Sequence, residues 1–272
     1  MRNNERRTGA AAQGPAAQSQ SLSFAVPTEF VELPSEGKLY PPEHPLHNQK
    51  TVEIKFMTAK EEDILSSEAL LKNNLALDRL IESLAVEDID ANSLLLGDRS
   101  AILMAARISG YGSEYKITYT CSECFSKTDT SFDLKNHTLE KGGLDEDFLQ
   151  ENGIVYCDDT LTFDVALPTS GVEVGMRLLT GALEKTFDQK GKEDGLITGF
   201  LSSVITKENK NTDPAYVKEF IDIMPARDSK HIRELYPKLI PSVSMKNRFV
   251  CSACYTEKDQ EVPLTAEFFW PE

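Results

Sequence analysis

Four cysteines are arranged in two short pairs that could bind a metal ion. Cys121 and Cys124 form one C-x-x-C motif, and Cys251 and Cys254 form the other. Zinc favours four ligands in a tetrahedron, with Zn–S distances of about 2.3 Å. We predict one structural zinc ion held by all four cysteines. Because four thiolates fill the coordination shell, we expect the ion to stabilise the fold and not to catalyse a reaction.

Other uses of the two pairs remain open at this point. A C-x-x-C motif can be a redox dithiol, and four cysteines can hold an iron–sulfur cluster. The intervening residues, Ser-Glu and Ser-Ala, do not lie in a thioredoxin-like strand-helix context, which favours zinc over a dithiol. The remaining cysteine, Cys157, is interpreted as an inert buried thiol.

Residues that could support catalysis do not form a recognisable set. The sequence has no H-E-x-x-H, G-x-S-x-G, G-x-G-x-x-G or phosphate-binding Gly-rich motif. His44 and His47 lie in a Pro-rich loop that we expect to be solvated. The acidic run 145–147 lacks the alternating spacing of a calcium loop. His137 and His231 also lack an obvious acid or nucleophile partner, so we expect the protein not to be an enzyme.

Strand-like segments flank each cysteine pair. Residues 115–120 precede the first pair and 125–132 follow it, while 246–250 and 258–264 flank the second. Each pair is therefore predicted to lie at the turn of a β-hairpin, in a zinc-ribbon-like arrangement. About 126 residues separate the two pairs, far more than in a usual ribbon.

The helical patterns come before each hairpin. Thr58 and Glu61 have the spacing of a capping box, and apolar residues then recur at helical intervals through 64–71, 77–84 and 98–108. In the second half, a strand is expected at 161–167. Helices are expected at 174–179, 196–204 and 216–223. The aromatic end Phe268-Phe-Trp270 is expected to dock on the protein itself.

The two halves match each other around the cysteines. A shift of 130 positions without a gap aligns Cys121 with Cys251, and the other matched pairs are Asp98 with Asp228, Ile102 with Ile232, Tyr119 with Phe249, Ser122 with Ser252, Cys124 with Cys254 and Leu134 with Leu264. We infer a distant internal duplication, with chance similarity between two zinc hairpins as the alternative. The equivalent hairpins of two pseudo-symmetric halves would meet naturally at one ion.

These patterns predict an α+β fold of two pseudo-repeated halves, each with a strand, helices and a cysteine-containing hairpin, joined by the shared site. The expected division is a disordered tail at 1–20, an extended arm and strand at 21–58, a first half at 59–135 and a second half at 136–272.

The composition disfavours nucleic acids and membranes as partners. The formal net charge is −15, with 44 acidic and 29 basic residues, which opposes non-specific attraction to nucleic acid and to anionic lipid. No apolar segment has the length of a membrane span or resembles a signal peptide, so we expect a cytoplasmic protein that does not bind membranes.

The order of several segments resembles the baseplate protein family of T-even-type contractile-tailed bacteriophages. These segments are Val31–Ser35 with Gly37 and Tyr40, Met57–Leu65, Leu96–Arg99, Arg107 with Tyr111–Tyr115, both C-x-x-C pairs, and Phe268–Pro271. The resemblance implies a role in virion assembly, as a component or an assembly factor of the baseplate hub. It implies other phage baseplate or hub proteins as partners and no small-molecule substrate. It also implies a location in the host cytoplasm during assembly and, for a component of the virion, in the tail baseplate afterwards.

A second function belongs to another class. Lys116, Lys127, Lys246, Arg248 and Lys258 supply a modest basic stripe near the cysteines. A zinc-ribbon nucleic-acid-binding or regulatory protein is therefore the alternative, although the negative net charge opposes a nucleic-acid partner.

Overall fold

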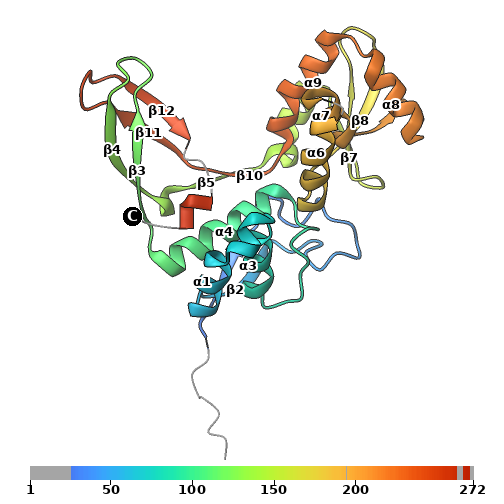
Figure 1. Ribbon diagram of the computed structural model, residues 1–272. Coiled ribbons are helices and arrows are strands. Elements are labelled where there is room, and N and C mark those ends of the chain that lie inside the picture. Colours follow the sequence, from blue (N-terminus) through green and yellow to red (C-terminus); the bar gives the residue numbers. More distant parts are fainter. Residues whose placement is uncertain (1–25, 194, 262–265, 270–272) are drawn as a thin grey trace, which may run out of the picture.

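The computed structural model describes residues 26–193, 195–261 and 266–269, and it has the predicted mixture of helices and strands. The predicted tail at 1–20 lies outside the described residues. Figure 1 shows a base formed by the N-terminal helices, from which two lobes rise. One lobe consists of the two cysteine-bearing hairpins, and the other contains α6 to α9.

The first half begins with an antiparallel hairpin of β1 (Thr28–Glu32) and β2 (Thr51–Lys55). The helices α1 (Ala59–Ser66), α2 (Glu68–Lys72), α3 (Ala76–Leu84) and α4 (Leu96–Tyr111) follow. Thr58 and Glu61 form the predicted capping box of α1. The Thr58 hydroxyl accepts from a backbone N–H of the first turn, and the Glu61 carboxylate accepts from the backbone N–H of Thr58 at 2.9 Å. The predicted helices at 77–84 and 98–108 are confirmed as α3 and α4.

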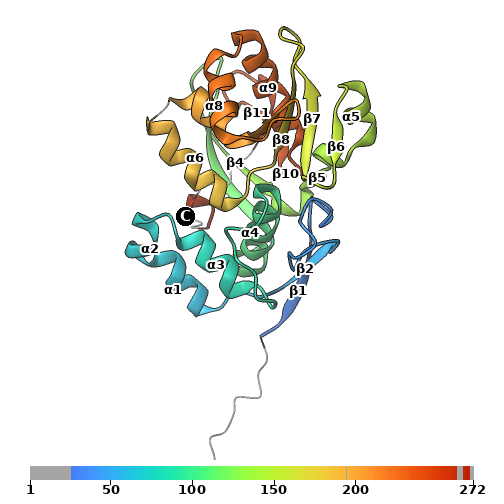
Figure 2. The same cartoon turned by 90° about the vertical axis from the view of Figure 1, so that its right-hand side faces the viewer.

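The second half contains a four-stranded antiparallel sheet in the order β6-β7-β8-β9. Its strands are β6 (Val155–Cys157), β7 (Thr162–Ala166), β8 (Glu173–Arg177) and β9 (Ile205–Glu208). The helices are α5 (Glu146–Glu151), α6 (Gly181–Glu193), α7 (Leu196–Val204), α8 (Pro214–Ile223) and α9 (Ala226–Leu239). Figure 2 shows α6, α8 and α9 beside this sheet.

One predicted helix is wrong. Residues 174–179 were expected to be helical, but 173–177 form β8, which lies between β7 and β9. Val174 and Met176 alternate into the core and are fully buried, a period-two pattern that pairing on both sides stabilises. The helix begins only at Gly181.

The two halves share an order of elements. In each half, an antiparallel pair of strands is followed by helices, a further helix with a buried Asp in its first turn, and a cysteine-bearing hairpin. The pair β1–β2 corresponds to β7–β8, because the first strand of each pair is followed by Leu-Pro. The leucine also makes the same bond in both halves: the Leu33 N–H donates to the carbonyl of Lys50 at 2.9 Å, and the Leu167 N–H donates to that of Val172 at 2.8 Å. The aligned Asp98 and Asp228 are both buried.

Each buried Asp holds the turn that follows the first strand of its half. Asp98 Oδ1 accepts from the backbone N–H of Ser35 at 3.0 Å, and Asp228 Oδ1 accepts from that of Thr169 at 2.7 Å. Ser35 and Thr169 occupy the same position after Leu-Pro. The same contact, made by aligned residues, supports the internal duplication.

A two-stranded ribbon runs between the lobes. It pairs β5 (Thr138–Glu140), which follows the first hairpin, with β10 (Ser242–Ser244), which precedes the second. In Figure 1 this ribbon passes above α4 from the α9 side to the hairpin side. Gly97 of α4 permits the close approach, because a Cβ there would lie 1.8 Å from the carbonyl oxygen of Pro241.

The described part of the C-terminus docks on the first half, as predicted for the aromatic end. Phe268 and Phe269 are buried, and the Phe268 ring meets Tyr115 edge to face at a centroid distance of 5.1 Å. Arg107 of α4 is fully buried and donates from Nε to the Phe268 carbonyl at 2.9 Å. Trp270 lies outside the described residues.

Candidate metal centre

Two hairpins of the same construction carry the cysteines. The strands β3 (Glu114–Thr120) and β4 (Lys127–Asp133) flank Cys121 and Cys124. The strands β11 (Lys246–Val250) and β12 (Glu257–Glu261) flank Cys251 and Cys254. The hairpins predicted around the cysteines are therefore present.

Each turn is closed by the same two backbone hydrogen bonds. Cys121 N–H donates to Ser126 and Phe125 N–H donates to Cys121, both at 3.0 Å, and Cys251 and Tyr255 repeat these bonds at the same distances. The residue after each second cysteine is aromatic and left-handed, with φ of +57° at Phe125 and +59° at Tyr255. Such values are unusual for bulky side chains, so the two turns share a backbone shape that their sequences do not prefer.

The four sulfurs form one compact group. Cys121 Sγ lies 3.7 Å from Cys254 Sγ, and Cys124 Sγ lies 3.6 Å from Cys251 Sγ, while all four atoms lie within 4.8 Å of one another. A tetrahedron with Zn–S bonds of about 2.3 Å has S···S edges of about 3.8 Å. The donor set and its spacing therefore fit a four-thiolate metal site, and the group could hold a metal ion.

The contacts between the hairpins are reciprocal. The buried cysteine of each hairpin has the exposed cysteine of the other hairpin as a close neighbour. The aligned residues Tyr119 and Phe249 pack on each other, with ring centroids 3.7 Å apart. Contacts between equivalent patches are the signature of a two-fold relation, so the hairpins pair as two pseudo-symmetric halves.

Hydrogen bonds around the sulfurs favour thiolates at two of the four positions. The Ser126 hydroxyl and the backbone N–H groups of Cys254 and Ala253 lower the pKa of the Cys251 thiol to about 5. The side chain and backbone of Ser126 also hold the pKa of Cys124 below its ordinary value. Thiolates are the form that binds metals, so these donors favour ligation at Cys124 and Cys251. The pKa of Cys254 is instead raised, because the hydrogen bonds from Thr256 are outweighed by contact with the Cys124 and Cys251 thiols and by burial.

The other candidates from the sequence do not join this site. His44 Nε2 contacts the Ser93 hydroxyl at 2.9 Å, and its ring stacks on Tyr40 at 4.2 Å. His47 Nδ1 contacts the carbonyl of Tyr40 at 2.7 Å. The two imidazoles of the Pro-rich loop thus make structural contacts. His137 likewise contacts the carbonyl of Leu134 at 2.9 Å.

The structure also gives a role to the acidic run 145–147 and places Cys157. Asp145 caps α5, because its carboxylate accepts from the N–H groups of Asp147 and Phe148 at 3.1 and 3.2 Å. Cys157 lies in β6 and is only half-buried, not buried as expected. The sheet explains this, because β6 has β7 on one side only.

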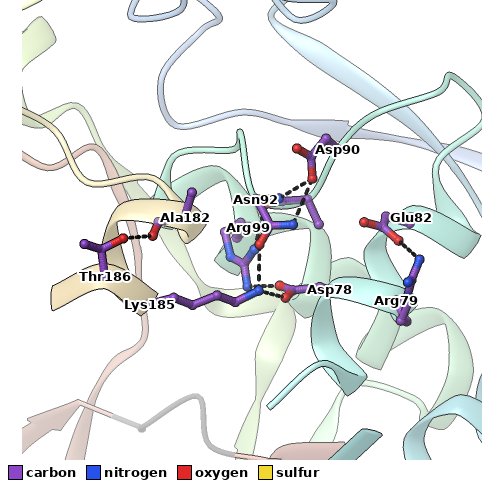
Figure 3. A network of polar contacts seen from close by, with 10 residues as sticks. Asp78, Arg79, Glu82, Asp90, Asn92, Arg99, Ala182, Lys185 and Thr186 are labelled. Atoms are coloured by element: carbon purple, nitrogen blue, oxygen red, sulfur yellow. Dashed lines mark hydrogen bonds and ion pairs between the residues drawn. The ribbon is translucent and has the colours of Figure 1, made fainter. Parts of the chain in front are cut away.

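Sequence reasoning missed a polar network that joins the two halves (Figure 3). Asp78 of α3 is buried and accepts from Arg99 Nη2 of α4 at 2.6 Å and from Lys185 Nζ of α6. Lys185 also donates to Asn92 Oδ1 at 2.6 Å. The only sequence signal was that Asp78 lies three positions before Ile81, which belongs to the apolar face of α3.

Comparisons with known proteins give one family. A family model described as T4 bacteriophage base plate protein matches residues 27–270, nearly the whole chain. No curated protein and no solved structure gives a significant match. Within the described residues, no helix has the length and apolar character needed to cross a membrane.

Proposed function

The chain belongs to the T4 bacteriophage base plate protein family, and from this membership we propose that it is a structural or hub-assembly protein of the phage tail baseplate. It acts by binding other baseplate proteins, during assembly in the host cytoplasm, and it performs no catalysis. The observation that carries this proposal is the family match over residues 27–270.

The proposed cofactor is one structural zinc ion on Cys121, Cys124, Cys251 and Cys254. The spacing of the four sulfurs and the hydrogen bonds that favour thiolates support it. When bound, the ion supplies a cross-link between two hairpins that are distant in the sequence. The hairpin lobe then offers a rigid surface to partners.

Mass spectrometry of purified phage particles tests the proposed function. We expect the protein to be present at a fixed ratio to other baseplate proteins if it is a component. If it is a transient assembly factor, it is absent from particles, and its deletion leaves incomplete baseplates in infected cells. Normal particles without the protein, produced from a deletion phage, would contradict both forms of the proposal.

The nucleic-acid-binding alternative receives little support from the charges near the hairpins. Lys246 pairs with Glu140 at 2.7 Å, and Arg248 lies 3.6 Å from both Glu257 and Asp259. Because carboxylates already neutralise these cations, they offer little charge to phosphates. A gel-shift measurement at several salt concentrations distinguishes the two functions, since the proposed one predicts no salt-dependent shift.

A further inference from the structure

Among the described residues, nothing pairs with the outer edge of the strand β1. The strand pairs with β2, and no other strand among the described residues pairs with it. The bonds from Leu33 N–H to Lys50 and from Phe56 N–H to Pro27, both 2.9 Å, fix the pairing. Since bonding alternates along an antiparallel pair, the odd-numbered residues of β1 bond β2. The backbone groups of Thr28, Phe30 and Glu32 therefore face outward.

The second half shows what covers the equivalent edge. Its first strand, β7, corresponds to β1, and its outer edge is paired with β6 in an antiparallel manner. In that pairing Val155 lies opposite Asp164, and Cys157 lies opposite Thr162. Counted back from the shared Leu-Pro, Asp164 and Thr162 correspond to Phe30 and Thr28. Within the part of the chain that the structure describes, the edge that β6 fills in one half is thus unpaired in the other.

The chain cannot fill this edge with the same hairpin. Leu161, which immediately precedes β7, has φ of +51° and completes the turn from β6. The corresponding residue before β1 is Pro27. The proline ring fixes φ near −65°, so the left-handed conformation of that turn is closed to it. A strand on β1 must therefore arrive by another route than the one β6 takes.

The side chains along this edge specify a complementary strand. Phe30 is 70% exposed, a large apolar surface for a strand residue. Glu32 is exposed on the same face as Phe30, and Glu53 lies opposite Phe30 on β2. On the other face, Glu29 Oε1 is buried and has no hydrogen-bond partner. The edge therefore offers apolar surface, negative charge and an unsatisfied acceptor.

We propose that the outer edge of β1 binds an extended segment of another baseplate protein, which adds as an antiparallel strand in the position that β6 occupies on β7. This inference rests on the proposed function for the source of the partner. The segment places an apolar residue beside Phe30, a basic residue beside Glu32, and a hydrogen-bond donor beside Glu29. Main-chain bonds provide affinity, and the alternate side chains provide selectivity.

The experiment measures binding of synthetic peptides to the full chain by fluorescence anisotropy. Overlapping peptides that cover the other baseplate proteins of the same phage are the probes. We expect one or a few peptides of the stated pattern to bind. A version of each with alternate N-methylated backbone amides is the matched control, because it keeps the side chains and removes the edge-facing donors. It should bind at least about tenfold more weakly.

A variant tests the same edge from the protein side. Phe30→Pro removes an N–H that faces outward, so the bonds between β1 and β2 remain, and proline is tolerated on edge strands. This variant should lose at least about tenfold in peptide affinity, while Phe30→Tyr should stay within about threefold of the unchanged protein. Should Phe30→Pro fail to fold, the N-methylated peptides still decide the matter.

Three results would overturn the proposal. The first is that no baseplate peptide binds, or that binding is insensitive to N-methylation. The second is that amide exchange of Thr28 and Phe30 is already slow in the isolated full chain and becomes fast when residues 1–25 are deleted, which would assign the edge to the protein's own N-terminus. The third is a dimer that Phe30→Pro dissociates, which would assign it to a second copy. Particle composition tests the baseplate role separately, so the two failures are distinguishable.

Discussion

The close sulfur–sulfur contacts of the four-cysteine group each join one hairpin to the other. Cys121 is close to Cys254, and Cys124 is close to Cys251. Neither hairpin alone provides more than two ligands, whereas a structural zinc site needs four. At the residue scale, a single cysteine therefore decides whether both hairpins can share an ion.

The first prediction is that the protein contains one zinc per chain, and that Cys121→Ser and Cys251→Ser each lose it. A serine hydroxyl is a poor replacement for a thiolate in a four-sulfur shell. Elemental analysis of the purified protein measures the content, and Cys157→Ser is the control that should keep its zinc. Two zinc ions per chain, or retention by both variants, would refute the shared site.

A second prediction concerns the buried carboxylate between the halves. Replacing Asp78 with Asn leaves the partly buried Arg99 and Lys185 without their counter-charge, and losing one partner of a buried pair costs about 3 kcal/mol. The exposed pair of Arg79 and Glu82 on the same helix is the control. Glu82→Gln should cost less than about 1 kcal/mol. Urea unfolding of both variants measures the difference, and equal losses would contradict the bridging role.

Asp78 also makes the free energy of unfolding depend on pH. Burial acts to raise the carboxyl pKa of Asp78, but hydrogen bonds from Lys185 and Arg99 outweigh it and hold the pKa below its usual range. A depressed folded-state pKa contributes stability above the unfolded value, near 4, and this contribution is lost as the pH falls through the folded value. The gap in unfolding free energy between the unchanged protein and Asp78→Asn should therefore narrow below about pH 4. A gap that is constant from pH 7 to pH 3 would argue against it.

At the scale of elements, the ribbon of β5 and β10 depends on close backbone contact with α4. Pro241, which immediately precedes β10, lies against Gly97 in the first turn of α4. Any side chain at position 97 would meet a backbone carbonyl and not a flexible side chain. The strand β10 of this ribbon connects α9 to the second cysteine hairpin. The packing of the ribbon on α4 therefore positions that hairpin.

The third prediction compares two glycines of the same helix. Gly97→Ala should destabilise the protein by about 2–3 kcal/mol, because the new methyl group overpacks against Pro241. Gly110→Ala should change stability by less than about 1 kcal/mol, since its Cβ would meet only the mobile side chain of Met57 and alanine favours helix. Thermal unfolding of the two variants checks this. A smaller loss of stability for Gly97→Ala than for Gly110→Ala would show that the ribbon of β5 and β10 does not pack closely on α4.

For the whole molecule, the proposed metal ion would close a loop of about 130 residues between Cys121 and Cys251, and this loop includes the entire second helical lobe. Cross-linking so long a loop is worth about 4 kcal/mol by analogy with a disulfide, and ligation adds to this because the unfolded chain has no preformed site. The hairpins connect to α4 directly and to α9 through β10. Loss of the ion should therefore also destabilise elements far from the cysteines.

The fourth prediction is that chelation loosens both halves together. Hydrogen exchange after metal removal should show lost protection in α4 around Ile102 and in α9 around Ile232, as well as in the strands of the hairpins. The control is the same measurement on the protein with zinc restored, which should recover the protection. Losses confined to residues 114–133 and 246–261 would mean that the ion is only a local clip.

Several features of this protein follow from local sequence. Ligand type and spacing indicated that Cys121, Cys124, Cys251 and Cys254 belong together, because the chemistry of a thiolate set does not depend on the fold. The capping box at Thr58 depends on residues three positions apart. The aligned Asp98 and Asp228 preserve the internal repeat, since each is a buried side chain that accepts from backbone N–H groups.

Other features were decided only by tertiary structure, because they depend on residues far apart in the chain. Val174, Leu178 and Leu179 match a helical spacing, yet pairing with β7 and β9 makes Val174 part of a strand. The division at 21–58, 59–135 and 136–272 stays a prediction. The buried charge of Asp78 is compensated by Lys185, which lies more than a hundred positions later in the sequence. Packing of the two halves brings the two side chains together. Local patterns fix ligands and caps, whereas strand partners and buried charges are set by what the folded chain brings next to them.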